Sequence, residues 1–232
     1  MLFRQLFDHA SYTYTYLLAD ESSAQAVLID PVVEKTDDYL RLISELGLNL
    51  KAVLDTHTHA DHVSAMGALR EKTQCLTLLG EQSRSECVSQ MFHDGEVVNI
   101  GQLKITAIHT PGHTDDSYSF VVKDGGKTLL FTGDTLLIRG SGRTDFQQGD
   151  ALQQYHSIFN KLLAYGDDAI IYPGHDYKGW ATSTVGEEKR NNPRLQVTNA
   201  QQYADIMNNL NLPNPKLMDV AVPANQRCGK LV

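Results

Sequence analysis

The chain contains the run Thr56-His57-Thr58-His59-Ala60-Asp61-His62. It follows directly on Lys51-Ala52-Val53-Leu54-Asp55, whose apolar centre predicts a buried strand. Three imidazoles and a carboxylate packed this closely disfavour one another unless a metal ion neutralises them or water surrounds them. In an open α/β sheet, ligands bind at the carboxyl ends of the strands, which is where this run lies. We therefore predict that the run forms part of a metal site.

Three later motifs have the same character, because each places a histidine or a carboxylate just after an apolar stretch. They are Thr110-Pro111-Gly112-His113-Thr114, Phe131-Thr132-Gly133-Asp134 and Tyr172-Pro173-Gly174-His175. Together with the first run they supply enough ligands for one or two metal ions. The remaining histidines stand alone and are interpreted as solvated or hydrogen-bonded residues: His9, His93, His109 and His156.

Apolar periodicity predicts alternating strands and helices in the first third of the chain and shorter strands in the middle. The predicted strands are 12–18, 26–31, 51–55, 75–79, 97–100, 103–109, 118–122, 128–132 and 169–173. The predicted helices are 36–46, 62–72, 151–163 and 199–210. We expect one catalytic domain over residues 1–232, with a C-terminal tail from about residue 199 that becomes irregular after residue 211.

Composition excludes several classes of protein. The net charge of −8 argues against a nucleic-acid binder, and no apolar run approaches the ~20 residues that cross a membrane. The N-terminus lacks the apolar segment of a signal peptide, so we expect a cytoplasmic protein. The three cysteines, Cys75, Cys87 and Cys228, are odd in number and widely spaced. We expect them to be reduced thiols.

The four motifs, in this order, resemble the metallo-β-lactamase superfamily. That resemblance implies an α/β (α+β) fold, an αββα sandwich of two mixed β-sheets flanked by helices, with the metal at one edge. It does not fix the chemistry, because most members are hydrolases in which two metals hold a bridging hydroxide.

Other segments resemble the persulfide dioxygenase family within that superfamily. They are residues 135–147, 172–179, 187–189, 191–195, 209–215, 222–225 and 228–229. The resemblance implies one Fe(II) per chain, bound by His57, His113 and Asp134. Two histidines and one carboxylate on one face leave positions for substrate sulfur and O2. The implied reaction converts glutathione persulfide, O2 and water into sulfite and glutathione.

The resemblance also assigns outer residues. Four more residues match the superfamily's metal motifs: His59, Asp61, His62 and His175. The resemblance implies that they either form hydrogen bonds around the iron site or are a vestigial second metal site. Arg143 and Tyr177 match positions that contact glutathione, although an ion pair of Arg143 with Asp145 and a packed Tyr177 are alternatives. Ser141 departs from many relatives, which have cysteine there.

Two alternatives of other classes remain. One is a glyoxalase II-like hydroxyacylglutathione hydrolase with two metals, whose family shares the histidine run but usually has a longer helical C-terminal region. The other is a non-catalytic binding protein, which the complete set of metal-binding residues disfavours. The expected partners are glutathione persulfide and O2. A homodimer is compatible with the tail, and any sulfurtransferase partner is expected to be a separate chain.

Overall fold

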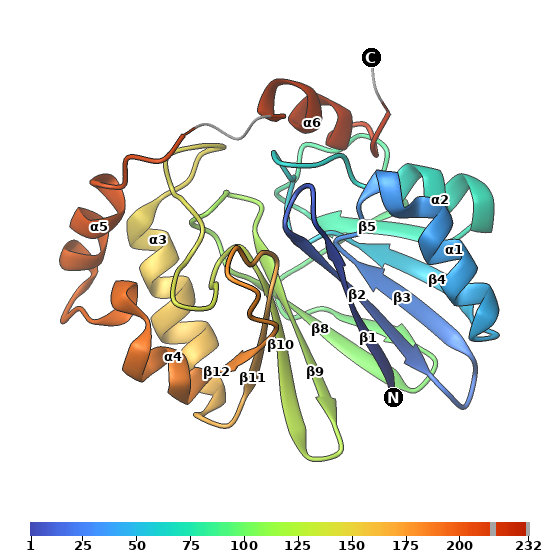
Figure 1. The fold of residues 1–232 in the computed structure, drawn as a ribbon, viewed down its shortest axis with the longest axis horizontal. Helices are drawn as coiled ribbons and strands as arrows, with labels where there is room; N and C mark the ends of the chain where they lie inside the picture. Colours follow the sequence, from blue (N-terminus) through green and yellow to red (C-terminus); the bar gives the residue numbers. More distant parts are fainter. Residues whose placement is uncertain (214–216, 231–232) are drawn as a thin grey trace. The chain divides into compact units, whose positions relative to one another are not determined.

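The computed structural model describes residues 1–213 and 217–230 (Figure 1). The chain forms two compact units. The first comprises residues 1–92, 97–105 and 214–232, and the second comprises residues 93–96 and 106–213. The single catalytic domain therefore stays a prediction. Within the described residues, no helix combines the length and the apolar character needed to span a bilayer.

The first sheet has six strands in the order β1-β2-β3-β4-β5-β6 (Figure 1). β1 pairs antiparallel with β2 and β2 with β3, whereas β3, β4, β5 and β6 pair in parallel. The strands are β1 (Leu2–Asp8), β2 (Thr13–Asp20), β3 (Gln25–Ile29), β4 (Asn49–Leu54), β5 (Leu76–Gly80) and β6 (Gln90–Phe92). Parallel neighbours require crossover connections. The β3–β4 crossover contains α1 (Thr36–Glu45) and the β4–β5 crossover contains α2 (Met66–Thr73), whereas β5 and β6 are joined by the loop of residues 81–89.

Apolar side chains of α1, α2 and the central strands make the core of the first unit. Tyr39 and Ile43 lie one turn apart on α1 and pack with Leu28 and Val53 of the sheet. The Tyr39 hydroxyl is also satisfied, since it lies 2.9 Å from Thr15 Oγ1 and accepts from the backbone N–H of Val32 at 3.1 Å. This packing fixes the carboxyl ends of β3 and β4, from which the histidine run leaves.

The second sheet has the order β12-β11-β10-β9-β8-β7. It is mixed too, because β10 is antiparallel to β9 and parallel to β11. Its strands are β7 (Val97–Ile100), β8 (Leu103–His109), β9 (Tyr118–Asp124), β10 (Lys127–Gly133), β11 (Ile170–Pro173) and β12 (Ser183–Thr184). The prediction of two mixed sheets is confirmed.

The helices of the second unit surround a separate core that includes Leu130, Ile158, Ile171 and Tyr203. α3 (Ala151–His156) begins at Asp150, whose carboxylate accepts from two backbone N–H groups, and it continues as a π-helix (Ser157–Leu162) and a 3-10 turn (Leu163–Tyr165). The other helices are α4 (Val185–Asn191), a 3-10 turn (Pro193–Leu195) and α5 (Ala200–Asn208).

One expectation about the C-terminal part was wrong. The predicted irregular tail contains the helix α6 (Met218–Asn225), although Pro223 lies inside it. Its formation depends on tertiary contacts that periodicity cannot reveal. Residues 214–216, including Pro215 of the tail motif, lie outside the described residues.

The cysteines are also not all reduced. Cys87 and Cys228 form a disulfide with their Cα atoms 5.9 Å apart, and Cys75 is a buried thiol. The two partners lie 141 residues apart in the sequence. That separation hides their proximity from any argument based on spacing.

Candidate metal centre

The histidine loop (residues 55–65) joins β4 to α2 within the first unit, and most of it is buried. His57, His59 and His62 are each only 1–2% exposed. Their rings contact one another at tilted angles, with centroids 4.2 Å apart between His57 and His59 and 4.3 Å apart between His59 and His62. Buried imidazoles in contact need defined hydrogen-bond or metal partners.

Asp30 organises this loop, although it was not among the residues predicted for the site. It follows β3 directly, with a positive φ of 52°. Its Oδ1 accepts from the Thr56 backbone N–H at 2.7 Å, and its Oδ2 accepts from the Thr56 hydroxyl at 2.9 Å. The sequence feature that could have identified Asp30 is its position, because it is a carboxylate just after the apolar run Ala26–Ile29.

These contacts fix the tautomer of His57. The Thr56 hydroxyl has one proton, which it donates to Asp30, because a carboxylate can only accept. The contact of 3.0 Å between Thr56 Oγ1 and His57 Nδ1 therefore uses the proton of Nδ1. Nε2 of His57 then carries the lone pair, as a metal ligand requires.

His59 lies in an acidic environment. Its Nε2 is 3.1 Å from Asp30 Oδ1, and its Nδ1 is buried without a hydrogen-bond partner among the described residues. Burial alone would lower the pKa of His59, but the charge of Asp30 and the hydrogen bond to it raise the pKa to about 9. Burial likewise raises the pKa of Asp55 to about 7, against the opposing effect of His59.

Two groups in and beside this loop have the composition of cation sites. One is His59, Asp61 and His62, and the other is Asp30, Asp55 and His59. Within each group one ligand atom per residue lies within 4.8 Å of the others. The orphaned Nδ1 of His59 and the surplus of acidic groups fit a cation. The first group contains three of the four residues predicted to be outer neighbours or a second metal site.

The second unit brings together His113, Asp134 and His175. His113 Nε2 lies 3.7 Å from Asp134 Oδ2, and His175 Nδ1 lies 2.7 Å from Asp134 Oδ1. His113 Nδ1 is 2.7 Å from the Arg143 carbonyl oxygen. A carbonyl can only accept, so Nδ1 of His113 carries the proton and Nε2 carries the lone pair. His113 and His57 thus have the same tautomer.

A chain of buried polar groups supports the segment that holds His113. The Ser141 hydroxyl lies 2.9 Å from the Tyr203 hydroxyl, which donates to Gln154 Oε1 at 2.8 Å. Gln154 Nε2 donates to the Gly142 carbonyl at 3.1 Å, and Arg194 donates to Ser141 Oγ at 3.0 Å. Burial raises the pKa of Tyr203 to about 12, so its hydroxyl keeps its proton. Ser141 is therefore a structural hydrogen-bonding residue in this chain.

The two predicted substrate contacts have neighbours of their own. The Arg143 guanidinium pairs with both carboxylate oxygens of Asp145, at 2.6 and 2.7 Å, and donates to the Pro213 carbonyl at 2.7 Å. The ion pair considered as an alternative for Arg143 is thus present. Tyr177 is 65% exposed, and its ring is parallel to that of His175. The packed alternative for Tyr177 is wrong, because a side chain this exposed is not part of a core.

His57 belongs to the first unit, whereas His113, Asp134 and His175 belong to the second. The assignment of His57, His113 and Asp134 to one ion therefore stays a prediction. Each unit supplies imidazoles whose Nδ1 protons are used internally, which is the chemistry expected of metal ligands.

Comparison with known proteins identifies the class. The model of the metallo-β-lactamase superfamily matches residues 10–83 and 88–175, and the chain belongs to that superfamily. The predicted fold, two mixed sheets flanked by helices, is confirmed.

Within the superfamily, the chain belongs to the persulfide dioxygenase family. It is 45% identical to the human mitochondrial persulfide dioxygenase ETHE1, over 99% of this chain and 89% of the human one. The crystal structure of ETHE1 from Myxococcus xanthus matches with a TM-score of 0.95 and 50% identity, covering 99% of this chain and all of that one. A probable hydroxyacylglutathione hydrolase of Schizosaccharomyces pombe is more distant, at 31% identity over 89% of this chain and 90% of its own length.

A substitution at Gly142 tests whether the close packing around His113 matters for metal binding. A Cβ at this position would lie 2.4 Å from the Asp134 carbonyl oxygen and 2.7 Å from His113 Nδ1. We predict that Gly142→Ala displaces His113 and lowers metal affinity about tenfold or more, the size of effect expected when a ligand loses its support. The measurement is metal content after dialysis against a graded chelator.

Gly140→Ala is the matched control, because the nearest atom to its added Cβ, in Leu137, is 3.9 Å away. It should retain normal metal affinity. Equal metal affinity in the two variants would show that the packing around His113 does not matter for binding.

Proposed function

We propose that the protein is a persulfide dioxygenase that oxidises glutathione persulfide with O2 and water to glutathione and sulfite. In this reaction the terminal sulfur gives up four electrons to O2, the S–S bond breaks, and water supplies the third oxygen of sulfite. Family membership supports the reaction class. The observation that carries the proposal is the shared tautomer of His57 and His113, which gives each residue a lone pair on Nε2.

We propose that His57, His113 and Asp134 hold one Fe(II). When bound, this ion would offer open positions to O2 and to the persulfide sulfur and would pass electrons from that sulfur to O2. The roles of the protein groups follow from their contacts. His175 donates its Nδ1 proton to Asp134 Oδ1, so Oδ2 is the oxygen that would bind the metal. Asp30, through Thr56, and the Arg143 carbonyl keep both imidazoles in the ligand tautomer.

Arg143 supplies local positive charge for an anionic substrate on a chain whose net charge is −8. We propose that a glutathione carboxylate pairs with Arg143 and that Tyr177 contacts the same substrate. A homodimer, a separate sulfurtransferase partner and a cytoplasmic location stay predictions. The human relative is described as mitochondrial.

The competing function is hydrolysis of glutathione thioesters by two metals, favoured by the group of His59, Asp61 and His62. The distinguishing measurement uses the purified holoenzyme. We expect about one iron per chain and O2 uptake on addition of glutathione persulfide, in a one-to-one ratio to the sulfite formed. Two metals per chain, with hydrolysis of S-lactoylglutathione and no O2 uptake, would overturn the proposal.

Single-histidine variants test the ligand set. His113→Ala should lose iron during purification, because one of three protein ligands is removed. His62→Ala should retain at least half of the iron, since His62 is not proposed as a ligand. His156→Ala is the control, because His156 is exposed and contacts Asn160 of its own helical segment. Equal iron loss in the His113 and His62 variants would refute the mononuclear assignment.

Variants at Arg143 and Asp145 separate substrate binding from a structural ion pair. Arg143→Ala should raise KM for glutathione persulfide about tenfold, the loss expected for a charge-assisted hydrogen bond, with little change in kcat. Asp145→Ala leaves the guanidinium in place and should keep KM within about twofold of the wild-type value. If both variants raise KM equally, Arg143 acts through the ion pair and does not bind substrate.

A further inference from the structure

We propose that Asn225 of α6 is a positioning residue for the histidine loop. We also propose that the Cys87–Cys228 disulfide is a reversible cross-link that keeps Asn225 in place. The inference rests on the proposed function in one respect, the role of His57 as a metal ligand. It adds two features: a support for that ligand from the far end of the chain and its dependence on redox state.

Asn225 uses its whole amide on the histidine loop. Its Oδ1 accepts from the Ser64 backbone N–H at 2.8 Å, and its Nδ2 donates to the carbonyls of His59 and His62, each at 2.9 Å. Its side chain is buried, at 5% exposure. The orientation of the amide is fixed by chemistry, because a backbone N–H only donates and a carbonyl only accepts. One side chain thus ties together three points of an irregular segment that contains the predicted ligand His57.

The helix that carries Asn225 has a small apolar contact with the rest of the first unit. Ala221 and Ala224 pack against Val63 and the partly buried Val33. The close backbone contacts come later, where Gly67 donates its N–H to the Cys228 carbonyl at 3.1 Å. The position of Asn225 therefore depends strongly on how the segment around Cys228 is held.

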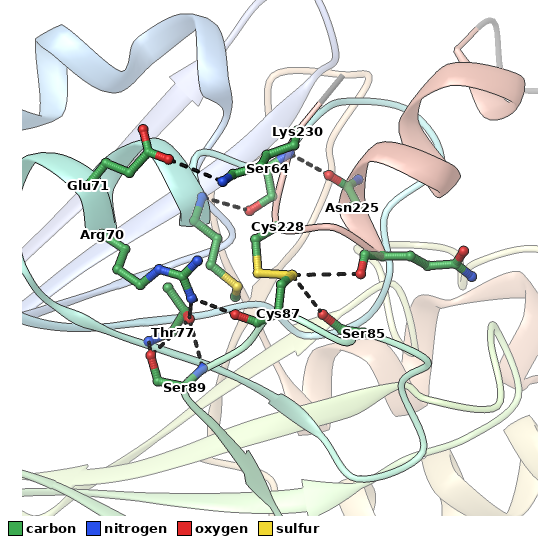
Figure 2. Close-up of a disulfide and its surroundings, with 12 residues drawn as sticks. Ser64, Arg70, Glu71, Thr77, Ser85, Cys87, Ser89, Asn225, Cys228 and Lys230 are labelled. Carbon is green, nitrogen blue, oxygen red and sulfur yellow. Dashed lines mark hydrogen bonds and ion pairs between the residues drawn. A yellow bond between two sulfur atoms is a disulfide. The ribbon is translucent and has the colours of Figure 1, made fainter. Parts of the chain in front are cut away.

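The disulfide holds that segment (Figure 2). Cys228 follows Asn225 by three residues, and its partner Cys87 lies between β5 and β6. Figure 2 shows the Cys87 side anchored in turn, since the Arg70 guanidinium donates to the Cys87 carbonyl and to Thr77 Oγ1. One covalent bond therefore joins the end of α6 to an anchored part of the first unit, beside the residue that holds the histidine loop.

The Cys87–Cys228 disulfide opens and closes by thiol–disulfide exchange. Cys228 is 2% exposed, whereas Cys87 is partly exposed, so an external thiolate reaches the Cys87 sulfur first. Attack there forms a mixed disulfide with Cys87 and releases Cys228 as a thiolate. A second external thiol then frees Cys87, which yields two protein thiols and one low-molecular-weight disulfide. The Cys87–Cys228 disulfide re-forms by the reverse reaction. The low-molecular-weight disulfide then takes up two electrons and two protons from the protein thiols and becomes two thiols.

The test measures binding of Co(II) alone, with its visible absorption spectrum as a report on ligand geometry. Asn225→Asp keeps the size of the side chain and its acceptor but places a carboxylate oxygen against the carbonyls of His59 and His62. We expect it to shift the Co(II) bands and to weaken Co(II) affinity about tenfold. Asn209→Asp is the control, because Asn209 is exposed and bonds only its own helix, through Asp205.

The redox arm repeats the measurement on the wild-type protein in glutathione and glutathione disulfide mixtures, with the disulfide quantified by mass spectrometry. Reduced wild type and Cys87→Ser should show the same three- to tenfold loss of Co(II) affinity. Without the disulfide the contact of Asn225 with the histidine loop is weakened, which should lower the affinity less than its removal does. Cys75→Ala, which removes the remaining thiol, should retain the redox dependence. In the double variant Cys87→Ser with Asn225→Asp, the losses should be less than additive, because both act through the same contacts.

The outcomes are distinct. An unchanged spectrum and affinity in Asn225→Asp overturns the positioning role, even if its melting temperature falls. If the oxidised and reduced wild-type proteins bind Co(II) with equal affinity, the proposed redox role of the Cys87–Cys228 disulfide is overturned. His57→Ala is measured alongside: if it keeps full Co(II) affinity, the proposed ligand set fails. If it loses affinity while the Asn225 and cysteine variants do not, only the present inference fails.

Discussion

An imidazole binds a metal only if one ring nitrogen keeps a lone pair, and the site of this protein depends on how its fold meets that condition. His57 and His113 both donate the Nδ1 proton inward, the first to a threonine hydroxyl and the second to a backbone carbonyl. Neither acceptor can act as the donor in these contacts, so both imidazoles keep the Nε2 lone pair that their proposed role as metal ligands requires. The acidic Asp30, behind Thr56, is therefore as important to the site as the histidines themselves.

The support for these ligands comes from segments that follow the superfamily motifs. In the second unit, Tyr203 of α5 ends a chain of hydrogen bonds that runs through Gln154 to the Gly142 carbonyl, next to the residue that accepts from His113. In the first unit, Asn225 of α6 bonds directly to the histidine loop. The C-terminal part of the chain thus supports candidate site residues within each unit.

Sequence reasoning succeeded where local pattern controls structure. The strands 97–100 and 103–109 were predicted with the bounds that the structure has, because alternating apolar residues between turn signals define them. It failed where contacts over long sequence separation control structure. α6 contains a proline and little apolar periodicity, and it forms against Val63 of a distant loop. The Cys87–Cys228 pairing was missed for the same reason.

The sequence by itself determined the types of the candidate ligands, their order along the chain and, through its resemblance to a family, the class of enzyme. It could do so because strand ends place His57, His113 and Asp134 by local rules that leave a pattern in the residues. Only the tertiary structure decided which nitrogen of each histidine carries the proton, which acid lies behind the loop and which amide holds it. Those are properties of side chains that meet across the fold, such as Asp30 with Thr56, and no spacing in the sequence records them.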